Sequence, residues 1–224
     1  MNKGFLEQIK GGLIVSCQAT AGPLKGRGLM AAMAEAAEAG GAAAIRAEGI
    51  SDIKAIKSVV KIPILGIIKL ETKETPVIIT PLLQNVVDLI EAGADMIAVD
   101  ATLRKRANGD LGPEFISKAR DFGIPILADI DNLESAIASE KAAADAISTT
   151  LAGYTGGVIP DQPDLQLVKD CVHRLNIPVI AEGRFATPDD VAAAFKAGAW
   201  SVCVGGAITD PYKSTIRFVK GINN

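Results

Sequence analysis

The sequence predicts a single (β/α)8 barrel, the TIM-barrel fold, with its active site at the carboxyl ends of the strands. Two strand patterns alternate along the 224 residues. In one, an Ile-Pro pair opens a short apolar run, since proline favours an extended backbone in the residue before it. In the other, an Ala- and Gly-rich helix end leads straight into an apolar strand. Eight strand–helix units of roughly 25 residues fit a barrel better than an open doubly wound sheet. No G-x-G-x-x-G follows the first strand, which disfavours a dinucleotide-binding fold.

The predicted elements follow one another in chain order. The first strand is 12–18, the Ile-Pro strands are 62–69, 124–129 and 177–182, and the helix-end and strand segments are 38–46, 91–100, 142–150 and 197–205. Helix-length segments include 27–39, 81–92, 113–122, 164–175 and 188–197. After the strand 177–182, Thr187 and Pro188 have the residue types preferred at a helix N-cap and at the first helical position. A buried strand with a charged last residue and a helix start is the unit that builds active sites in this fold.

Composition narrows the classes of function. A net charge of −3 with both signs interspersed is not typical of a surface that binds nucleic acid or membranes. No apolar run is close to the length needed to span a membrane. The three cysteines are an odd number without metal-type spacing, so neither disulfides nor zinc are expected. We expect one domain over residues 1–224, in which 1–10 form an amphipathic lead-in helix rather than a signal peptide. The predicted location is cytoplasmic.

The Ile-Pro pairs fix which strand residues point into the barrel. Side chains alternate between the two faces of a strand, and Lys69, Asp129 and Glu182 each lie an even number of residues after their proline. All three should therefore face the interior at the end of a strand. Single charges at strand ends commonly face water, but three in the same phase favour a site. Polar residues at other strand ends join them, namely Gln18, Arg46 and Asp100.

Glycines in the last two loops predict a phosphate site. Gly183 follows the seventh strand, Gly205 and Gly206 follow the eighth, and a helix begins soon afterwards. Backbone amides at such a position bind anions, and barrels commonly hold phosphate there. The simpler alternative is that these are ordinary turn glycines.

Other chemistries fit less well. The single histidine, His173, falls in the predicted helix 164–175, away from the strand ends, and no cysteine has a histidine partner for nucleophilic catalysis. Asp100, Asp129 and Glu182 form an alternative oxygen-ligand set for Mg²⁺, but we expect no metal and no cofactor. Thr149, Thr150 and Tyr154 could either bind a sugar or close their loop.

A lysine facing carboxylates, beside a phosphate site, allows two reactions. Neutral Lys69 could remove a proton next to a carbonyl, or it could form a Schiff base as in aldolases. Either reaction needs the pKa of Lys69 to fall well below about 10.4, through burial or through a cation such as Arg46. A phosphosugar-binding barrel without activity is a third hypothesis, but it would not need such a lysine.

The chain resembles the bacterial N-acetylmannosamine-6-phosphate 2-epimerases of sialic acid catabolism. The resemblance spans nearly the whole chain and rests on the segments 12–18, 40–46, 63–69, 96–102, 128–130, 148–155, 178–184 and 204–209. It implies a metal-independent barrel that interconverts N-acetylmannosamine 6-phosphate and N-acetylglucosamine 6-phosphate. The partner is then a small phosphosugar, and a homodimer is one option for the assembly.

The resemblance also assigns roles to residues. The family's catalytic positions fall on Lys69 and Glu182. Its substrate-binding positions fall on Gln18, Arg46, Asp129, Tyr154 and Arg184, and its phosphate loops on Gly183, Arg184, Gly205 and Gly206. Proton transfer by one base, by two bases or through substrate hydroxyls stays open.

This chain departs from the family pattern in two places. Asp210 stands where an arginine is usual, so we expect Lys213 or Arg217 to compensate. Leu103 and Ala107 also differ from the usual form of the loop after the fourth strand.

Overall fold

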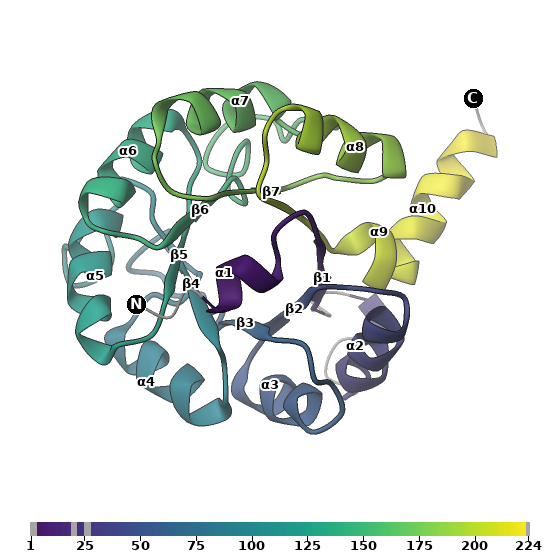
Figure 1. The fold of residues 1–224 in the computed structure, drawn as a ribbon, viewed down its shortest axis with the longest axis horizontal. Helices are drawn as coiled ribbons and strands as arrows, with labels where there is room; N and C mark the ends of the chain where they lie inside the picture. Colours follow the sequence, from purple (N-terminus) through teal and green to yellow (C-terminus); the bar gives the residue numbers. More distant parts are fainter. Residues whose placement is uncertain (1–3, 19–21, 25–27, 223–224) are drawn as a thin grey trace.

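Eight parallel strands close into a barrel in the computed structural model, which describes residues 4–18, 22–24 and 28–222. The strands pair in chain order, and β8 pairs with β1 to complete the ring. They are β1 Leu13–Cys17, β2 Ala44–Glu48, β3 Ile64–Ile67, β4 Met96–Asp100, β5 Ile126–Asp129, β6 Ala146–Ser148, β7 Val179–Glu182 and β8 Ser201–Val204. The predicted TIM-barrel fold is confirmed (Figure 1).

Helices form a ring around the strands (Figure 1). They are α2 Met30–Ala39, α3 Ile50–Lys57, α4 Leu83–Ala92, α5 Gly112–Ala119, α6 Leu133–Lys141, α7 Leu165–Arg174 and α8 Pro188–Lys196, with short 3₁₀ turns at Gly22–Leu24 and Arg120–Phe122. The helix predicted over 27–39 begins at Met30 in the structure, and Arg27 lies outside the described residues. Thr187 caps α8 as expected, because its side chain accepts a hydrogen bond of 3.2 Å from the amide of Asp190.

Alternation along the strands separates two apolar cores. Residues such as Ile14, Leu65 and Ile180 point inward and fill the barrel, whereas their strand neighbours pack against the helices. Cys17 belongs to the outer core and Cys203 to the inner one. The phase of each strand therefore decides which side chains can reach the barrel interior.

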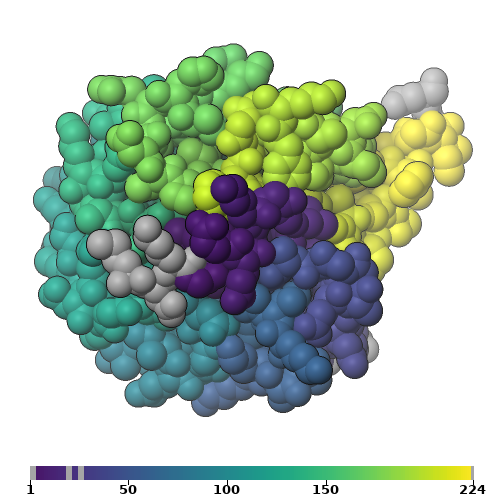
Figure 2. All heavy atoms as spheres, in the orientation of Figure 1, coloured from purple at the N-terminus to yellow at the C-terminus, as the bar shows by residue number. Residues whose placement is uncertain are grey.

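The amino-terminal helix closes one end of the barrel. Helix α1, Gly4–Gln8, lies across the opening that faces the viewer in Figures 1 and 2. Phe5 and Ile9 join the inner core, and Trp200 Nε1 donates a hydrogen bond of 2.8 Å to the carbonyl of Leu6. The predicted lead-in 1–10 thus contains a helix, although residues 1–3 lie outside the described part of the chain. With this end covered, access to the interior is at the carboxyl ends of the strands.

The last two helices leave the barrel wall. Helix α9, Gly206–Thr209, follows β8 and leads into α10, Pro211–Ile222, which projects beyond the ring of helices (Figure 1). None of the residues of α10 is buried. No helix in the described ranges is both long enough and apolar enough to cross a membrane.

Candidate active site

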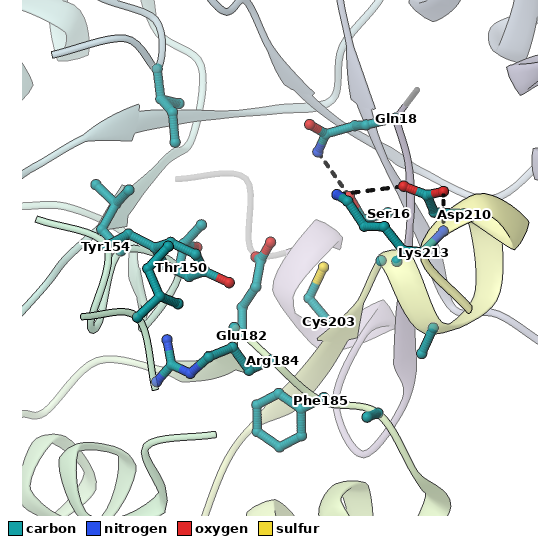
Figure 3. Close-up of a pocket in the computed structure, with 18 of the residues that line it drawn as sticks. Ser16, Gln18, Thr150, Tyr154, Glu182, Arg184, Phe185, Cys203, Asp210 and Lys213 are labelled. Atoms are coloured by element: carbon teal, nitrogen blue, oxygen red, sulfur yellow. Dashed lines mark hydrogen bonds and ion pairs between the residues drawn. The ribbon is translucent and has the colours of Figure 1, made fainter. Parts of the chain in front are cut away.

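A cavity of about 710 Å³ opens at the carboxyl ends of the strands, a volume typical of small-molecule sites. Most of the residues predicted for the site line it, as Figure 3 shows in part. These are Gln18, Lys69, Tyr154, Glu182, Gly183, Arg184, Gly205 and Gly206. The two remaining residues, Arg46 and Asp129, lie deeper in the barrel and contact Glu182 directly or through one another.

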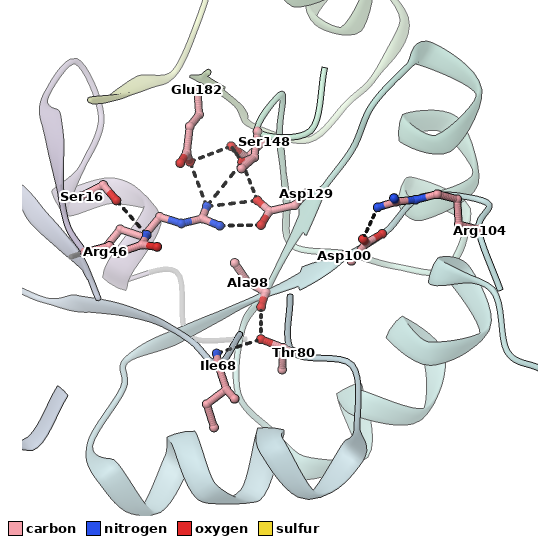
Figure 4. Close-up of polar contacts among 12 residues, drawn as sticks. Ser16, Arg46, Ile68, Thr80, Ala98, Asp100, Arg104, Asp129, Ser148 and Glu182 are labelled. Carbon is pink, nitrogen blue, oxygen red and sulfur yellow. Dashed lines mark hydrogen bonds and ion pairs between the residues drawn. The ribbon is translucent and has the colours of Figure 1, made fainter. Parts of the chain in front are cut away.

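Arg46 holds two carboxylates together inside the barrel (Figure 4). Its Nη1 lies 3.0 Å from Asp129 Oδ1 and 2.8 Å from Glu182 Oε2, while its Nη2 donates to Asp129 Oδ2. Arg46 and Asp129 are at most 1% exposed, whereas Glu182 is 13% exposed and reaches the cavity. The bidentate pair with Asp129 therefore anchors the guanidinium, and the guanidinium positions the carboxylate of Glu182.

Three hydroxyl groups of strand β6 and its loop complete this network. Thr150 Oγ1 donates to Asp129 Oδ1 at 2.7 Å and lies 2.8 Å from Ser148 Oγ, which is 3.2 Å from Glu182 Oε2. Thr149 instead bonds the backbone of Glu182, accepting from its amide at 3.0 Å and donating to its carbonyl at 2.9 Å. Of the two threonines, Thr150 lines the cavity and Thr149 fixes the end of β7.

The charged groups perturb one another in opposite directions. Burial raises the pKa of Glu182, and Arg46 offsets part of that rise. Burial lowers the pKa of Arg46, but Asp129 and Glu182 raise it by more, so the guanidinium stays charged. The pKa of Glu182 therefore moves toward the range in which a carboxyl group can serve as an acid near neutral pH.

Lys69 lies two residues beyond the end of β3, which closes at Ile67. Its backbone forms an antiparallel bridge with Ile79, so the chain doubles back beside the lysine. Burial, followed by the positive charge of Arg46, lowers the pKa of Lys69, while carboxylates including Glu48 oppose the shift. Within the part of the chain that is described, the Lys69 ammonium makes no hydrogen bond or ion pair, so the amine faces the cavity without a fixed partner.

Two inward-facing neighbours of the site were missed by sequence reasoning. Cys203 is the register partner of Glu182 on the adjacent strand and lines the cavity, as Figure 3 shows. Glu48 accepts a hydrogen bond of 3.3 Å from the amide of Lys69. The phase was counted from Ile-Pro pairs, and neither β2 nor β8 begins with one. Glu48 could still have been found, because it lies two residues after Arg46 and so on the same face of β2.

The loops that the sequence predicts to bind phosphate carry glycines at the border of the cavity. Gly183 has a φ of 106°, a conformation that side chains rarely adopt. Among the described residues, none accepts a hydrogen bond from the amides of Gly183, Gly205 or Gly206. These N–H groups border one end of the cavity and are available to bind a ligand.

The side chain of Arg184 is partly used by the protein itself. Its Nε donates to the carbonyl of Gln162 at 2.7 Å, and its Nη1 donates to the carbonyl of Ala152. The guanidinium also lies 5.4 Å from the ring centre of Tyr154. Arg184 therefore secures the loop after β6 and presents Tyr154 at the rim, in addition to lining the cavity.

Asp210 lies beside the phosphate loops and is only 6% exposed. Its Oδ1 accepts from the amide of Lys213 at 3.0 Å, and its Oδ2 is 3.4 Å from Lys213 Nζ. The lysine is about half exposed and lies against Gly206, and Arg217 lines the same cavity. Both cations that the sequence offers as compensation for the missing arginine thus line the cavity, and Figure 3 shows Lys213 beside Asp210.

Asp100, one of the strand-end carboxylates, does not join Asp129 and Glu182. It is fully buried and binds the side chains of Thr102, at 2.7 Å, and Arg104, at 2.6 Å. Across the described ranges, no group of three His, Cys, Asp or Glu residues has the arrangement of a metal site. His173 lies exposed on α7, where its Nδ1 is 2.8 Å from the carbonyl of Lys169. The carboxylates of the alternative Mg²⁺ ligand set are therefore paired with arginines, Asp129 and Glu182 with Arg46 and Asp100 with Arg104.

Comparison with known proteins gives one consistent family. Residues 30–224 match the family model described as "Putative N-acetylmannosamine-6-phosphate epimerase". Proteins named "Putative N-acetylmannosamine-6-phosphate 2-epimerase" are similar along almost their entire length. One from Clostridium perfringens is 45% identical, covering 96% of this chain and 98% of its own, and one from Clostridioides difficile is 43% identical, covering 97% and 99%.

Two solved structures are similar to this chain, one from the same family and one with the same fold. The characterised N-acetylmannosamine-6-phosphate 2-epimerase from Clostridium perfringens superposes with a TM-score of 0.92 at 44% identity, covering 96% of this chain and 95% of that one. A thiamine phosphate pyrophosphorylase from Pyrococcus furiosus superposes with a TM-score of 0.63 at 19% identity, covering 91% and 89%. The second likeness reflects the shared barrel fold alone.

Proposed function

The chain belongs to the N-acetylmannosamine-6-phosphate epimerase family, and we propose that it interconverts N-acetylmannosamine 6-phosphate and N-acetylglucosamine 6-phosphate as a single-domain barrel enzyme. The observation that carries this proposal is the meeting of Lys69 and Glu182 in one cavity, with opposite pKa shifts. A lysine whose pKa is lowered can act as a base, and a carboxyl group whose pKa is raised can act as an acid.

The proposed reaction proceeds through the open-chain aldehyde, because only then does the C1 carbonyl acidify the proton on C2. Lys69 Nζ takes that proton, and the bonding electrons form an enolate whose charge rests on the C1 oxygen. Protonated Glu182, supported by Arg46, stabilises this oxygen by hydrogen bonding. A proton then reaches the opposite face of C2, either from a second protein group, after which Lys69 releases its own proton to solvent, or from Lys69 itself through substrate hydroxyls. This step gives the other epimer and restores the aldehyde.

The remaining site residues hold the substrate in this proposal. Gly183, Arg184, Gly205 and Gly206 bind the phosphate at the β7 and β8 side of the cavity, where Lys213 adds positive charge. Gln18 and Tyr154 line the same cavity and contact sugar oxygens, while Arg46 and Asp129 act from beneath. Gln18 Nε2 donates a hydrogen bond of 2.8 Å to Ser16 Oγ, and this bond holds the side-chain amide of Gln18 in place.

Incubation of the purified protein with N-acetylmannosamine 6-phosphate, followed by proton NMR, tests this function. The proposal requires formation of N-acetylglucosamine 6-phosphate. A Schiff-base aldolase would instead be trapped covalently on Lys69 by borohydride in the presence of substrate. A barrel that only binds phosphosugars would show saturable binding without turnover.

The proposed chemistry uses neither a metal nor a cofactor. The carboxylates that could bind a cation are bound by guanidinium groups, Asp129 and Glu182 by Arg46 and Asp100 by Arg104. Activity should therefore survive exhaustive chelation. Loss of activity with EDTA and its recovery with one divalent cation would give these carboxylates a ligand role.

We further propose a homodimer. Helix α10 carries exposed apolar side chains, with Phe218 79% and Ile222 81% exposed, and such groups on a projecting helix favour contact with another protein surface. Light scattering should give twice the mass of the 23.2 kDa chain. Phe218→Asp should shift the mass toward the monomer, and an unchanged mass would place the contact elsewhere.

A cytoplasmic location completes the proposal. Cys17, Cys171 and Cys203 are all unpaired and buried, as is usual in a reducing compartment. Recovery of the native protein in a periplasmic or secreted fraction would contradict it.

A further inference from the structure

One wall of the cavity combines apolar side chains with an arginine and has no role in the reaction described above. Pro76, Ile78 and Ile79 come from the loop between β3 and α4, and Arg104 comes from the loop after β4. The two loops are joined, because Thr75 Oγ1 donates to the carbonyl of Lys105 at 2.6 Å. In the closed ring, β3 and β4 lie across from β7 and β8, so this wall faces the phosphate loops.

Arg104 is held in place by buried groups. Its Nη2 donates to Asp100 Oδ2 at 2.6 Å (Figure 4). Its Nε donates to Thr102 Oγ1 at 3.1 Å. Asp100 and Thr102 are fully buried, while Arg104 is 25% exposed. No described residue accepts a hydrogen bond from Nη1, so one end of an otherwise fixed guanidinium remains available at the cavity wall. Such preorganisation lowers the entropy lost when a ligand binds.

The wall lies directly beside Lys69. Ile79 forms a backbone bridge with Lys69, and its carbonyl accepts from the amide of Asp100 at 3.1 Å. Ile79 thus stands between the lysine and the carboxylate that holds Arg104. Lys69 and this wall line the same cavity, so a group attached to the carbon at which Lys69 acts has this wall as its neighbour.

We propose that Arg104, Pro76, Ile78 and Ile79 form the subsite for the acetamido group on C2, with Arg104 Nη1 donating a hydrogen bond to the acetamido carbonyl. The inference rests on the proposed function, in which C2 is the reacting carbon and the phosphate on C6 lies at the opposite end. An acetamido group has a carbonyl oxygen that needs a donor and a methyl group that favours apolar contact. The wall supplies both, and a site built to bond a substrate group disfavours analogues that lack it.

The test compares two ligands that differ at C2. KM and kcat are measured with N-acetylmannosamine 6-phosphate, and the inhibition constant is measured with mannose 6-phosphate, which carries a hydroxyl in place of the acetamido group. Arg104→Ala should lower kcat/KM for the acetamido substrate by about 10- to 100-fold, the loss expected for a charge-assisted hydrogen bond. The same change should alter the inhibition constant of mannose 6-phosphate by less than about threefold, since its C2 hydroxyl is shorter than the acetamido group and lacks the carbonyl to which Nη1 would donate. Lys105→Ala, an exposed neighbour in the same loop, is the control and should change neither.

Equal losses for both ligands would overturn the proposal, because they would indicate a structural role or a contact with the shared part of the sugar phosphate. No loss for either would overturn it as well. If the wild-type protein does not turn over the acetamido substrate at all, the proposed function fails instead. Failure of the subsite assignment is thus distinguishable from failure of the proposed function.

A second variant keeps the test independent of the buried carboxylate. Removal of Arg104 leaves Asp100 without its cation, so Arg104→Ala could reduce folding. Ile78→Ala leaves this pair intact and enlarges the apolar part of the subsite. It should raise kcat/KM for the N-propanoyl analogue relative to the N-acetyl substrate by about tenfold, the low end of the value of one methylene group in an apolar pocket. An unchanged ratio would contradict the assignment of this wall to the acyl group.

Discussion

Arg46 and Asp129 are joined by two hydrogen bonds deep in the barrel, and each is at most 1% exposed. Removal of one member of such a pair leaves the other charge buried without compensation. We expect Arg46→Met to destabilise the protein by about 3–5 kcal/mol, the usual cost of breaking a buried ion pair. The double variant Arg46→Met with Asp129→Leu should recover most of that loss, as measured by urea unfolding. A double variant no more stable than the single one would show that the pair is not the cause.

Glu182 should set the alkaline side of the pH profile. Its pKa is raised by burial and that of Lys69 is lowered, so the reactive form pairs a protonated carboxyl group with a neutral amine. The kcat/KM should fall at low pH as Lys69 gains a proton, and at high pH as Glu182 loses one. Glu182→Gln should lower kcat with little change in KM, and its profile should keep the acid decline but lose the alkaline one. Persistence of the alkaline decline in this variant would assign that limb to another group.

Lys213 should contribute to phosphate binding through its charge. It borders the glycine loops and pairs only loosely with Asp210 across 3.4 Å, so the ammonium can turn to a phosphate. Lys213→Ala should raise KM for the phosphosugar several-fold, and more than it lowers kcat, which is the signature of lost uniform binding. Arg217→Ala should act in the same direction. Lys220→Ala, later on the exposed helix α10, is the matched control. If Lys213→Ala and Arg217→Ala both keep the wild-type KM, the backbone amides and Arg184 bind the phosphate without these cations.

The buried charge of Lys69 should lower the free energy of unfolding of the substrate-free protein. Its pKa is lowered in the folded protein, so between the folded and unfolded pKa values the unfolded chain binds more protons, and stability rises with pH. At pH 7 the cost of holding the charged form is present, and Lys69→Met should remove it. The melting temperature should rise by a few degrees, on the scale of about 2–4 °C per kcal/mol. The gain should shrink as the pH approaches about 10.4. A lower melting temperature for Lys69→Met at pH 7 would contradict the assigned direction of the shift.

Much of this arrangement could be predicted from local sequence. The Ile-Pro pairs fixed the phase of the strands that end near Lys69, Asp129 and Glu182, and the repeated strand–helix units predicted the barrel that brings these ends together. Alternation is a property of the backbone, so it can be counted without knowing tertiary contacts. The three residues do meet at one end of the barrel, with Asp129 beneath the cavity that Lys69 and Glu182 line.

Contacts between distant elements could not be predicted in the same way. Asp100 has the expected strand-end position but is bound by Arg104, four residues later, which depends on how the loop folds. Arg184 follows a phosphate-loop glycine, yet two of its nitrogens bond carbonyls of the loop after β6. Cys203 stands beside Glu182 because of the register between β7 and β8, and register is set by the closure of the whole barrel.

The role of Lys69 as the base at C2 is the central claim, and exchange of the C2 proton with solvent tests it most directly. When the wild-type protein acts on N-acetylmannosamine 6-phosphate in D₂O, both epimers should incorporate deuterium at C2, and proton NMR measures this exchange. Lys69→Ala should lose epimerisation by at least about 10²–10⁴-fold, the usual contribution of a general base, and should show no exchange above background. Its retained affinity for the phosphosugar and its circular dichroism spectrum serve as controls for folding. Exchange at C2 at the wild-type rate in Lys69→Ala would contradict the account, because another residue would then be the base.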